Sequence, residues 1–381
     1  MLDFVTNRRV ILGEGAVKEI PSVLDWYCKK KVFLCVFSKE AECVKNIEEI
    51  LKSNCIDYII YDKIVGEPDL DVIDNGADLC ISEGCDAVVA VGGGSVIDTS
   101  KMISMMASNG GKTEDYQLNG KEVKNIPILF VAVATTAGTG AEATKVSVVY
   151  NQKKGFKKAV YHNSMIAEVA ILDPATTVGL PPKFTVSTGM DAITHAIESY
   201  ISNNANVISR MYSLKALELL VQNIKTVYHE PENMKARENM LLGSYFAGCA
   251  ISAGTCLAHI VGQPVGAIFK IPHGDSCTIF LTPSMRLNMD YVTKEYAEIA
   301  KVMGVDPQGK TEKEIAMEGI EVLEAIEEEI NAPTKLSQYM KREDFDMEMV
   351  LDNIQTSMGH IKTNPNPARR ELFKELLEMV W

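Results

Sequence analysis

The chain has 381 residues, of which 46% are hydrophobic and 23% are charged, and its net charge is −13. This length exceeds the usual size of one core and predicts two globular domains, while the negative charge argues against nucleic acid or an anionic membrane as a partner. Nine scattered cysteines, with no C-x-x-C pair, are typical of reduced thiols in a cytoplasmic protein. The sequence holds no apolar run of the ~18 residues that span a bilayer, so we expect no membrane segment.

The first part of the chain alternates short apolar runs with amphipathic segments. We expect strands over residues 32–37, 58–61, 86–91 and 126–134, and helices over 42–53, 68–79 and 96–106. Such alternation predicts βαβ units and therefore a parallel sheet in a dinucleotide-binding α/β domain covering residues 1–180. From residue 181 the pattern changes to helical periodicity, as over 211–227 and 233–245. We expect an all-α domain over 181–381, with the double proline at 181–182 ending regular structure at the junction.

Two loops rich in small residues follow successive strands of the first domain. One contains Gly92, Gly93, Gly94 and Ser95, followed by Asp98 in the first turn of the next expected helix. Glycines at such a turn allow backbone N–H groups to approach a pyrophosphate, and the helix N-terminus adds partial positive charge. The second loop carries three hydroxyl side chains, those of Thr135, Thr136 and Thr139. Loops after parallel strands share one sheet edge, where nucleotides bind in open α/β sheets.

A carboxylate and three imidazoles in the second domain have the composition of a metal site. Asp191 and His195 are spaced i, i+4, which places them on one helical face, and His259 and His273 follow in a Gly/Pro-rich stretch. Three nitrogen donors and one oxygen donor suit Fe(II), Zn(II) or Mn(II) and leave coordination positions open for a substrate.

These motifs occur in one order along nearly the whole chain, which resembles the iron-containing (group III) alcohol dehydrogenases. The resemblance rests on the Gly92–Ser95 turn with Asp98 and Lys101, the 135–139 loop, the G-x-D-A-x-x-H-A-x-E motif over 189–198, and Pro272-His273-Gly274. It implies an alcohol dehydrogenase or aldehyde reductase that transfers hydride between a metal-bound alkoxide and C4 of NAD or NADP. It also implies a small-molecule alcohol or aldehyde as substrate, and a homodimer or larger homo-oligomer.

The resemblance also assigns residues to roles. It places the metal, Fe(II) or alternatively Zn(II), on Asp191, His195, His259 and His273, which would act in catalysis through that metal. It places the nucleotide on residues of both loops and on a lysine that reaches the cofactor ribose. These cofactor residues are Gly93, Gly94, Ser95, Asp98, Thr135, Thr136, Thr139 and Lys158. For Lys158, an exposed hairpin lysine without a ligand is an equally good interpretation.

Two departures from the family pattern bear on mechanism and cofactor choice. Gln263 stands four residues after His259, where many members have a histidine that assists proton transfer, and an amide does not titrate. Ser38 stands after the first nucleotide-binding strand, where an aspartate often binds the adenosine ribose and repels a 2′-phosphate. With Lys39 adjacent, the missing negative charge predicts that NADP is accepted, alone or beside NAD.

Two other functions fit part of the pattern. A non-redox metal enzyme of the dehydroquinate-synthase type would share the nucleotide domain and the metal, but it needs lysines and arginines that converge on a phosphorylated sugar acid. The helical half shows no such cluster. A catalytically silent relative is the other alternative, with Gln263 as the sign of lost chemistry.

Overall fold

A computed structural model of the protein describes residues 2–154, 156–356 and 361–381. The chain packs into two compact units. The first contains the residues up to Thr136 together with Gly140–Gly179, and the second contains Ala137–Thr139 and Leu180–Trp381. The short piece Ala137–Thr139 therefore belongs with the second unit although it lies far from it in sequence.

The first unit is built on a parallel sheet of six strands, in the order β1-β8-β5-β4-β2-β3. Its strands are β1 (Arg9–Leu12), β2 (Lys31–Val36), β3 (Asp57–Tyr61), β4 (Ala87–Gly92), β5 (Leu129–Ala134) and β8 (Val169–Leu172). Gly92 pairs with Ala134 in register, so the loops that follow β4 and β5 start side by side at the carboxyl edge of the sheet. A separate antiparallel hairpin pairs β6 (Val146–Asn151) with β7 (Phe156–Tyr161).

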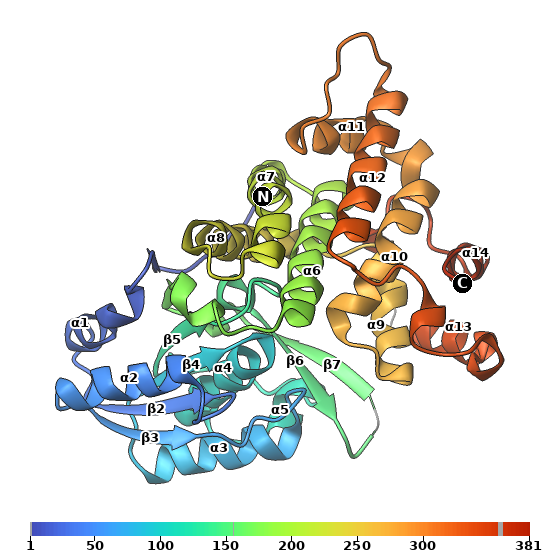
Figure 1. Ribbon diagram of the computed structural model, residues 1–381. Coiled ribbons are helices and arrows are strands. Elements are labelled where there is room, and N and C mark those ends of the chain that lie inside the picture. Colours follow the sequence, from blue (N-terminus) through green and yellow to red (C-terminus); the bar gives the residue numbers. More distant parts are fainter. Residues whose placement is uncertain (1, 155, 357–360) are drawn as a thin grey trace. The chain divides into compact units, whose positions relative to one another are not determined.

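Helices cover both faces of this sheet (Figure 1). They are α1 (Ile20–Trp26), α2 (Glu42–Ser53), α3 (Leu70–Ser82), α4 (Gly94–Asn109) and α5 (Thr113–Leu118). Alternate residues of β2 point to opposite sides: Leu34 packs in one apolar cluster with residues of α1 and α2, and Phe33 packs in another with residues of α3 and α4. The central strands are buried on both faces, which explains their continuous apolar sequences.

The second unit is helical apart from its loops. Its helices are α6 (Pro182–Ile201), α7 (Val207–His229), α8 (Met234–Ala250), α9 (Leu257–Phe269), α10 (His273–Asn288), α11 (Thr293–Val302), α12 (Glu312–Glu329), α13 (Met347–Thr356) and α14 (Arg370–Met379). The parallel sheet and the helical unit confirm the predicted fold class.

The expected role of the double proline and two expected element boundaries were wrong for physical reasons. The double proline does not stop regular structure but starts it: Pro181 is the N-cap of α6 and Pro182 its first residue, where the missing N–H costs no hydrogen bond. The helix expected from residue 68 begins at Leu70, because the Asp69 side chain caps it by accepting from the Val72 N–H at 2.8 Å. The strand expected from residue 126 begins at Leu129, and Ile126 is 91% exposed.

Within the described residues, no single helix is both long enough and apolar enough to cross a membrane. One bent pair, Met234–Ala253 with Leu257–Phe269, meets the length and composition test across a 103° bend.

Candidate active site

Helix α6 carries two of the four residues expected to bind a metal. Asp191 and His195 lie one turn apart on it, and both are buried, at 2% and 4% exposure. Their side chains meet, with His195 Nε2 at 3.8 Å from Asp191 Oδ1. The helical spacing read from the sequence therefore brings these two donors together.

Two further helices supply the other imidazoles. His259 lies in the first turn of α9, and His273 is the first residue of α10. The Nε2 atoms of His259 and His273 lie 3.5 and 3.6 Å from Asp191 Oδ1. One carboxylate oxygen is thus surrounded by three imidazole nitrogens, all of them in the helical unit.

The donor atoms of this cluster fit a divalent metal ion. Two ligands about 2.0–2.1 Å from one ion at a tetrahedral angle lie ~3.4 Å apart, close to the observed separations. Asp191 Oδ1 and His259 Nε2 are fully buried and have no hydrogen-bond partner among the described residues. A buried polar atom without a partner is costly, and a bound cation would satisfy both atoms at once.

Glu198 holds His259 in a ligand-ready orientation. One Glu198 oxygen, Oε2, lies 2.7 Å from His259 Nδ1, and the other, Oε1, accepts from the Ala258 N–H at 2.7 Å. In a neutral imidazole whose Nδ1 proton this carboxylate accepts, Nε2 keeps its lone pair for a metal. Glu198 belongs to the motif over 189–198, but the motif alone assigns it no role. Its spacing of three residues from His195 was the signal that could have pointed to one.

Charge and burial set the protonation of the α6 pair. Burial acts to raise the pKa of Asp191, but the surrounding histidines outweigh it and hold that pKa well below its usual range. Burial lowers the pKa of His195 to about 4. A carboxylate and a neutral imidazole are the forms that bind metals.

The thiol of Cys277, which belongs to no sequence motif described above, lies beside the imidazoles. Cys277 follows His273 by one turn of α10, is fully buried, and has its Sγ 3.9 Å from His273 Nε2. Burial acts to raise the pKa of Cys277, but His259 and His273 outweigh burial and lower it. The i, i+4 spacing from His273 was again the available signal.

The two expected nucleotide loops start next to each other in the first unit, although Thr139 of the second loop belongs to the second unit. Gly93 is the N-cap of α4, Gly94 and Ser95 form its first turn, and the Thr135 N–H donates to Gly92 O at 3.1 Å. A Cβ on Gly93 would lie 3.0 Å from Thr136 Oγ1, so only glycine fits there comfortably. Gly93, Gly94, Ser95 and Thr136 stay partly exposed, and so does Thr139. The loops therefore present accessible N–H and hydroxyl groups at a helix N-terminus.

Two other expected cofactor residues make contacts that stabilise the fold. Asp98 accepts from Lys101 Nζ and from the Val148 N–H, both at 2.9 Å, and so ties α4 to β6. Lys158 is exposed on β7, where its backbone oxygen accepts from Gln117 Nε2 at 3.1 Å. Neither contact needs a ligand.

Ser38 lies just after β2, partly exposed, with its hydroxyl accepting from the Glu40 N–H at 3.2 Å. The neighbouring Lys39 pairs with Asp62, with Nζ 3.5 Å from Oδ2. This ion pair offsets part of the positive charge on which the NADP prediction depends.

Gln263 is exposed on α9, four residues after His259.

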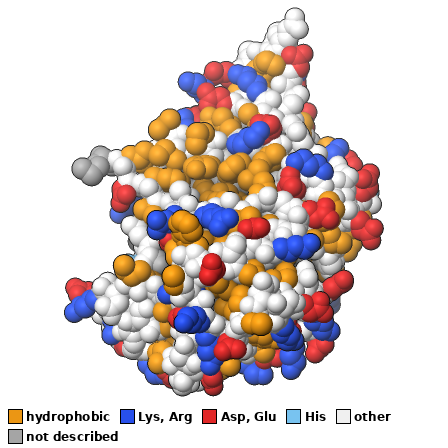
Figure 2. All heavy atoms as spheres, turned by 90° about the vertical axis from the view of Figure 1, so that its left-hand side faces the viewer, with side chains coloured by type: hydrophobic (Ala, Val, Ile, Leu, Met, Phe, Trp, Pro, Cys, Tyr) orange, Lys and Arg blue, Asp and Glu red, His pale blue; other side chains and the backbone are white. Residues whose placement is uncertain are grey.

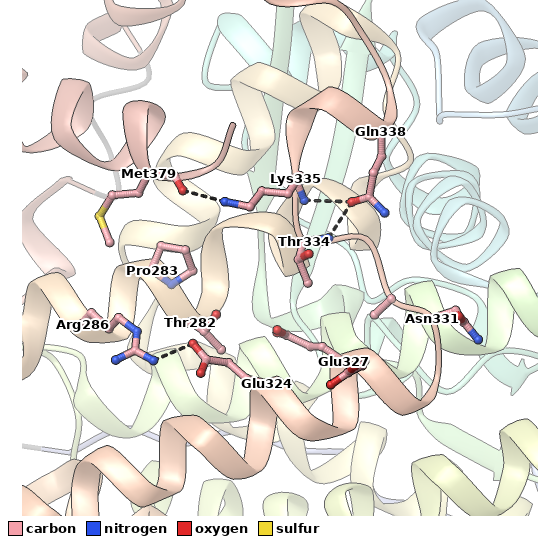
Figure 3. A pocket seen from close by; sticks show the side chains of 12 residues that line it. Thr282, Pro283, Arg286, Glu324, Glu327, Asn331, Thr334, Lys335, Gln338 and Met379 are labelled. Atoms are coloured by element: carbon pink, nitrogen blue, oxygen red, sulfur yellow. Dashed lines mark hydrogen bonds and ion pairs between the residues drawn. The ribbon is translucent and has the colours of Figure 1, made fainter.

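The helical unit also has a separate pocket of about 610 Å³ between α10, α12 and the following loop (Figure 3). Arg286 pairs with Glu324 there at 2.7 Å, while Glu327 is buried beside them with no partner for its Oε1 within the described residues. The metal-ligand candidates do not line this pocket.

The parallel sheet with its small-residue loops, and the Asp/His cluster on three helices, define the class of two-domain, nucleotide-linked metal enzymes. Comparison with known protein families supports this class. Residues 7–174 match the family described as iron-containing alcohol dehydrogenase, and residues 185–381 match the C-terminal domain of the Fe-containing alcohol dehydrogenase family.

Curated relatives and solved structures cover almost the whole chain. An NAD-dependent methanol dehydrogenase of Bacillus methanolicus is 31% identical over 96% of both chains, and a lactaldehyde reductase of Escherichia coli is 30% identical over 99% of both. A 1,3-propanediol oxidoreductase structure matches with TM-score 0.95 at 27% identity, covering both chains fully. A sulfoacetaldehyde reductase of Bifidobacterium kashiwanohense, in complex with NAD+, matches with TM-score 0.90 at 26% identity, covering 100% of this chain and 99% of that one. The chain belongs to the iron-containing alcohol dehydrogenase family, as its motifs indicated, and it is an oxidoreductase of the alcohol dehydrogenase class.

Proposed function

We propose that this protein is a metal-dependent, NAD(P)-linked aldehyde reductase and alcohol dehydrogenase acting on small substrates. The observation that carries the proposal is the convergence of three imidazole Nε2 atoms within 3.5–3.8 Å of Asp191 Oδ1. Relatives that span nearly the full chain are named for methanol, lactaldehyde and sulfoacetaldehyde, which supports a short aldehyde or alcohol.

Each part of the chain has its own task in this proposal. Asp191, His195, His259 and His273 hold the metal, which when bound acts as a Lewis acid on the substrate oxygen. Gly93, Gly94 and Ser95 hold the cofactor pyrophosphate, with Thr135, Thr136 and Thr139 along the same sheet edge. Asp98 and Lys158 are proposed cofactor contacts in addition to the fold contacts that they make.

Gln263 has a limited part in this proposal. An amide can donate to and accept from a substrate or water, but it cannot act as an acid or base near neutral pH. Gln263 therefore orients groups at the site, and the proton reaches solvent by another route.

Iron(II) is the proposed resident metal because the family is described as iron-containing, with zinc(II) as the alternative. For the nucleotide, Ser38 favours acceptance of NADP beside NAD. Ser38 lacks the negative charge that would repel a 2′-phosphate, while Lys39, although paired with Asp62, remains 57% exposed at its side chain.

Assembly and location form a further part of the proposal. Strand β1 is at the edge of the sheet and exposes Val10 and Leu12, at 39% each. Figure 2 shows one face of the molecule on which hydrophobic side chains gather. An unpaired edge with apolar side chains favours association, so we propose a homodimer or larger homo-oligomer. The nine cysteines are scattered along the sequence and form no C-x-x-C pair, which supports a reducing compartment such as the cytoplasm.

The experiment that tests the function follows the nicotinamide absorption band. Protein loaded anaerobically with Fe(II), or with Zn(II), is mixed with NADH or NADPH and a panel of short aldehydes. We expect metal-dependent loss of absorbance with at least one short aldehyde. No loss with any aldehyde under either metal would contradict the dehydrogenase function and favour the catalytically silent alternative.

A further inference from the structure

The helix that carries His259 has no N-terminal cap of its own. The first turn of an α-helix leaves N–H groups without intrahelical partners, and the residue before the helix often satisfies one of them with its side chain. Cys256 is the N-cap residue of α9, but its side chain makes no capping hydrogen bond. By contrast, Asn206 and Asn233 cap α7 and α8 with their own side chains. The start of α9 therefore depends on residues from elsewhere in the chain.

Two remote side chains cap α9 instead. Asn364 Oδ1 accepts from the Leu257 N–H at 3.2 Å, although the two residues are 107 positions apart in sequence. Glu198 Oε1 accepts from the Ala258 N–H at 2.7 Å. Leu257 and Ala258 are the first two residues of α9, and His259 is the third. The N–H groups of both residues before this candidate metal ligand are thus held by side chains from other segments.

The Asn364 side chain is buried, at 2% exposure, and uses its full hydrogen-bonding capacity. Besides the bond from Leu257, its Oδ1 accepts from Asn288 Nδ2 at 2.9 Å. Its Nδ2 donates to Asn288 Oδ1 at 3.0 Å and to the Asn366 backbone oxygen at 2.7 Å. An amide side chain has two acceptor sites and two donor hydrogens, so all of them are used. This network fixes the orientation of the amide and keeps its oxygen at the start of α9.

The same point of the chain contacts the other two helices that carry metal-ligand candidates. Asn288 is the last residue of α10, which begins at His273. Asn203, just after the end of α6, donates from its N–H to the Thr363 oxygen at 2.8 Å and from Nδ2 to the Asn364 backbone oxygen at 2.9 Å. Thr363 and Asn364 therefore contact the end of α6, the start of α9 and the end of α10.

We propose that Asn364 is a positioning residue for the metal centre, which places His259 by capping the start of α9 from outside the helix. The proposal rests on the proposed function only for the existence of that centre. Asn364 acts through the backbone of Leu257, two residues before His259, and not through the imidazole ring. The competing interpretation is a buried asparagine that stabilises the packing of α9 against α10 and does not affect metal binding.

Two variants of the full-length protein separate the cap from the packing. Asn364→Ala removes the acceptor for the Leu257 N–H together with the amide pair. Asn288→Ala removes the same amide pair from the α10 side, but leaves Asn364 bonded to Leu257 and Asn366. We expect both variants to unfold at lower urea concentration than wild type in the metal-free state, because each leaves buried polar groups unpaired.

Zinc affinity, measured by competition with a chelator, should distinguish the two variants. Loss of a group that orients a metal ligand costs about 10–100-fold in affinity, and we expect a fall of about 10-fold in Asn364→Ala. The fall in Asn288→Ala should be clearly smaller, because the cap remains. Equal falls in the two variants would support the packing interpretation and overturn the proposal.

The unmodified protein gives a test that does not depend on how a variant folds. If the cap favours metal binding at His259, then bound metal must strengthen the cap, because coupling between two sites is reciprocal. We expect Zn(II) to slow hydrogen exchange of the Leu257 N–H clearly more than that of the Ala236 N–H. Ala236 is the matched control, since its N–H is also capped by an asparagine, Asn233, at 3.1 Å, but at the start of α8. Equal slowing at both amides would refute the positioning role.

The zinc titrations also separate failure of this proposal from failure of the metal centre. A wild-type chain that binds no more Zn(II) than His259→Ala would overturn the centre itself. A wild-type chain that binds Zn(II) more tightly than His259→Ala, with the same affinity as Asn364→Ala, would keep the centre and refute the role of Asn364.

Discussion

At the scale of single residues, the site depends on how each ligand is oriented. Glu198 uses one carboxylate oxygen on His259 Nδ1 and the other on the Ala258 N–H. In Glu198→Gln one of these positions must be occupied by an NH₂ group. If the NH₂ group faces His259 Nδ1, it donates a hydrogen bond to Nδ1, and the imidazole proton must move to Nε2. If it faces the Ala258 N–H instead, two donors oppose each other. We therefore expect metal affinity to fall about 10–100-fold in a chelator competition. The exposed Glu312→Gln is the control, and wild-type affinity in Glu198→Gln would contradict this role.

Glu327 gives a prediction for stability against pH. It is 2% exposed, and burial raises its pKa to about 8. Because the folded value is above the unfolded one, the protonated carboxyl stabilises the fold fully below pH ~4.3, and this contribution is lost as pH rises to about 8. Glu327→Gln removes the titration. We expect the unfolding free energy of the variant to increase relative to that of wild type as pH rises through this window. Each unit of pKa difference between the folded and unfolded states corresponds to about 1.4 kcal/mol, so the increase can reach several kcal/mol. Urea unfolding at pH 5 and pH 8 measures it, with the exposed neighbour Glu328→Gln as control. A constant difference between the two pH values would refute it.

A substitution at Ser38 tests whether this residue contributes to the choice between NAD and NADP. An aspartate at this position would meet a 2′-phosphate with like charge and could accept from a ribose 2′-hydroxyl. We expect Ser38→Asp to shift the ratio of kcat/KM for NADP over NAD toward NAD by at least ~10-fold, or about 1.4 kcal/mol. Ser53→Asp, at the exposed end of α2, should leave the ratio unchanged. An unchanged ratio in Ser38→Asp would show that this residue does not contact the adenosine ribose.

At the scale of elements, the close approach of α10 to α6 brings His273 to Asp191. A Cβ on Gly274 would lie 2.0 Å from the Ser187 backbone oxygen, so only glycine allows this contact. Gly274→Ala should push the start of α10 away from α6, costing about 1–3 kcal/mol in unfolding free energy and weakening metal binding. Gly179→Ala, where a Cβ would meet nothing within 4 Å, is the control. Thermal unfolding and metal titration of Gly274→Ala measure both effects. Wild-type values for both would show that α10 adjusts without moving His273.

Element types followed from local patterns, whereas contacts between elements did not. Continuous apolar runs identified β2 and β4, and the i, i+4 spacing of Asp191 and His195 placed them on one helical face. The i, i+4 spacing could also have placed Cys277 on the same face of α10 as His273. The sequence could not show that Glu198 reaches α9, because that contact depends on how α6 and α9 pack. The prolines at 181–182 were misinterpreted since proline ends a helix from inside but starts one at its first position.

At the scale of the whole molecule, the structure has two compact units that divide near residue 180, where the sequence pattern changes, and the roles of the two units stay predictions. The sequence could not predict that Ala137–Thr139 belongs to the helical unit, because this depends on a long-range contact. A Cβ on Gly138 would lie 2.7 Å from Thr188 Cβ. The family relationship places a metal and a nicotinamide cofactor in one enzyme. The described geometry puts the candidate metal ligands entirely within the helical unit, so metal loss should leave the Gly92–Ser95 turn of the first unit intact.

The most direct test of this account is metal content and turnover of anaerobically purified wild-type protein beside His259→Ala. His259 contributes Nε2 to the cluster and is positioned by Glu198, so its loss removes both a donor and the partner of a buried carboxylate. We predict about one divalent metal per wild-type chain, and in His259→Ala the loss of metal and turnover with NADH binding largely kept. Full activity of His259→Ala after chelation would contradict the assignment of the metal centre.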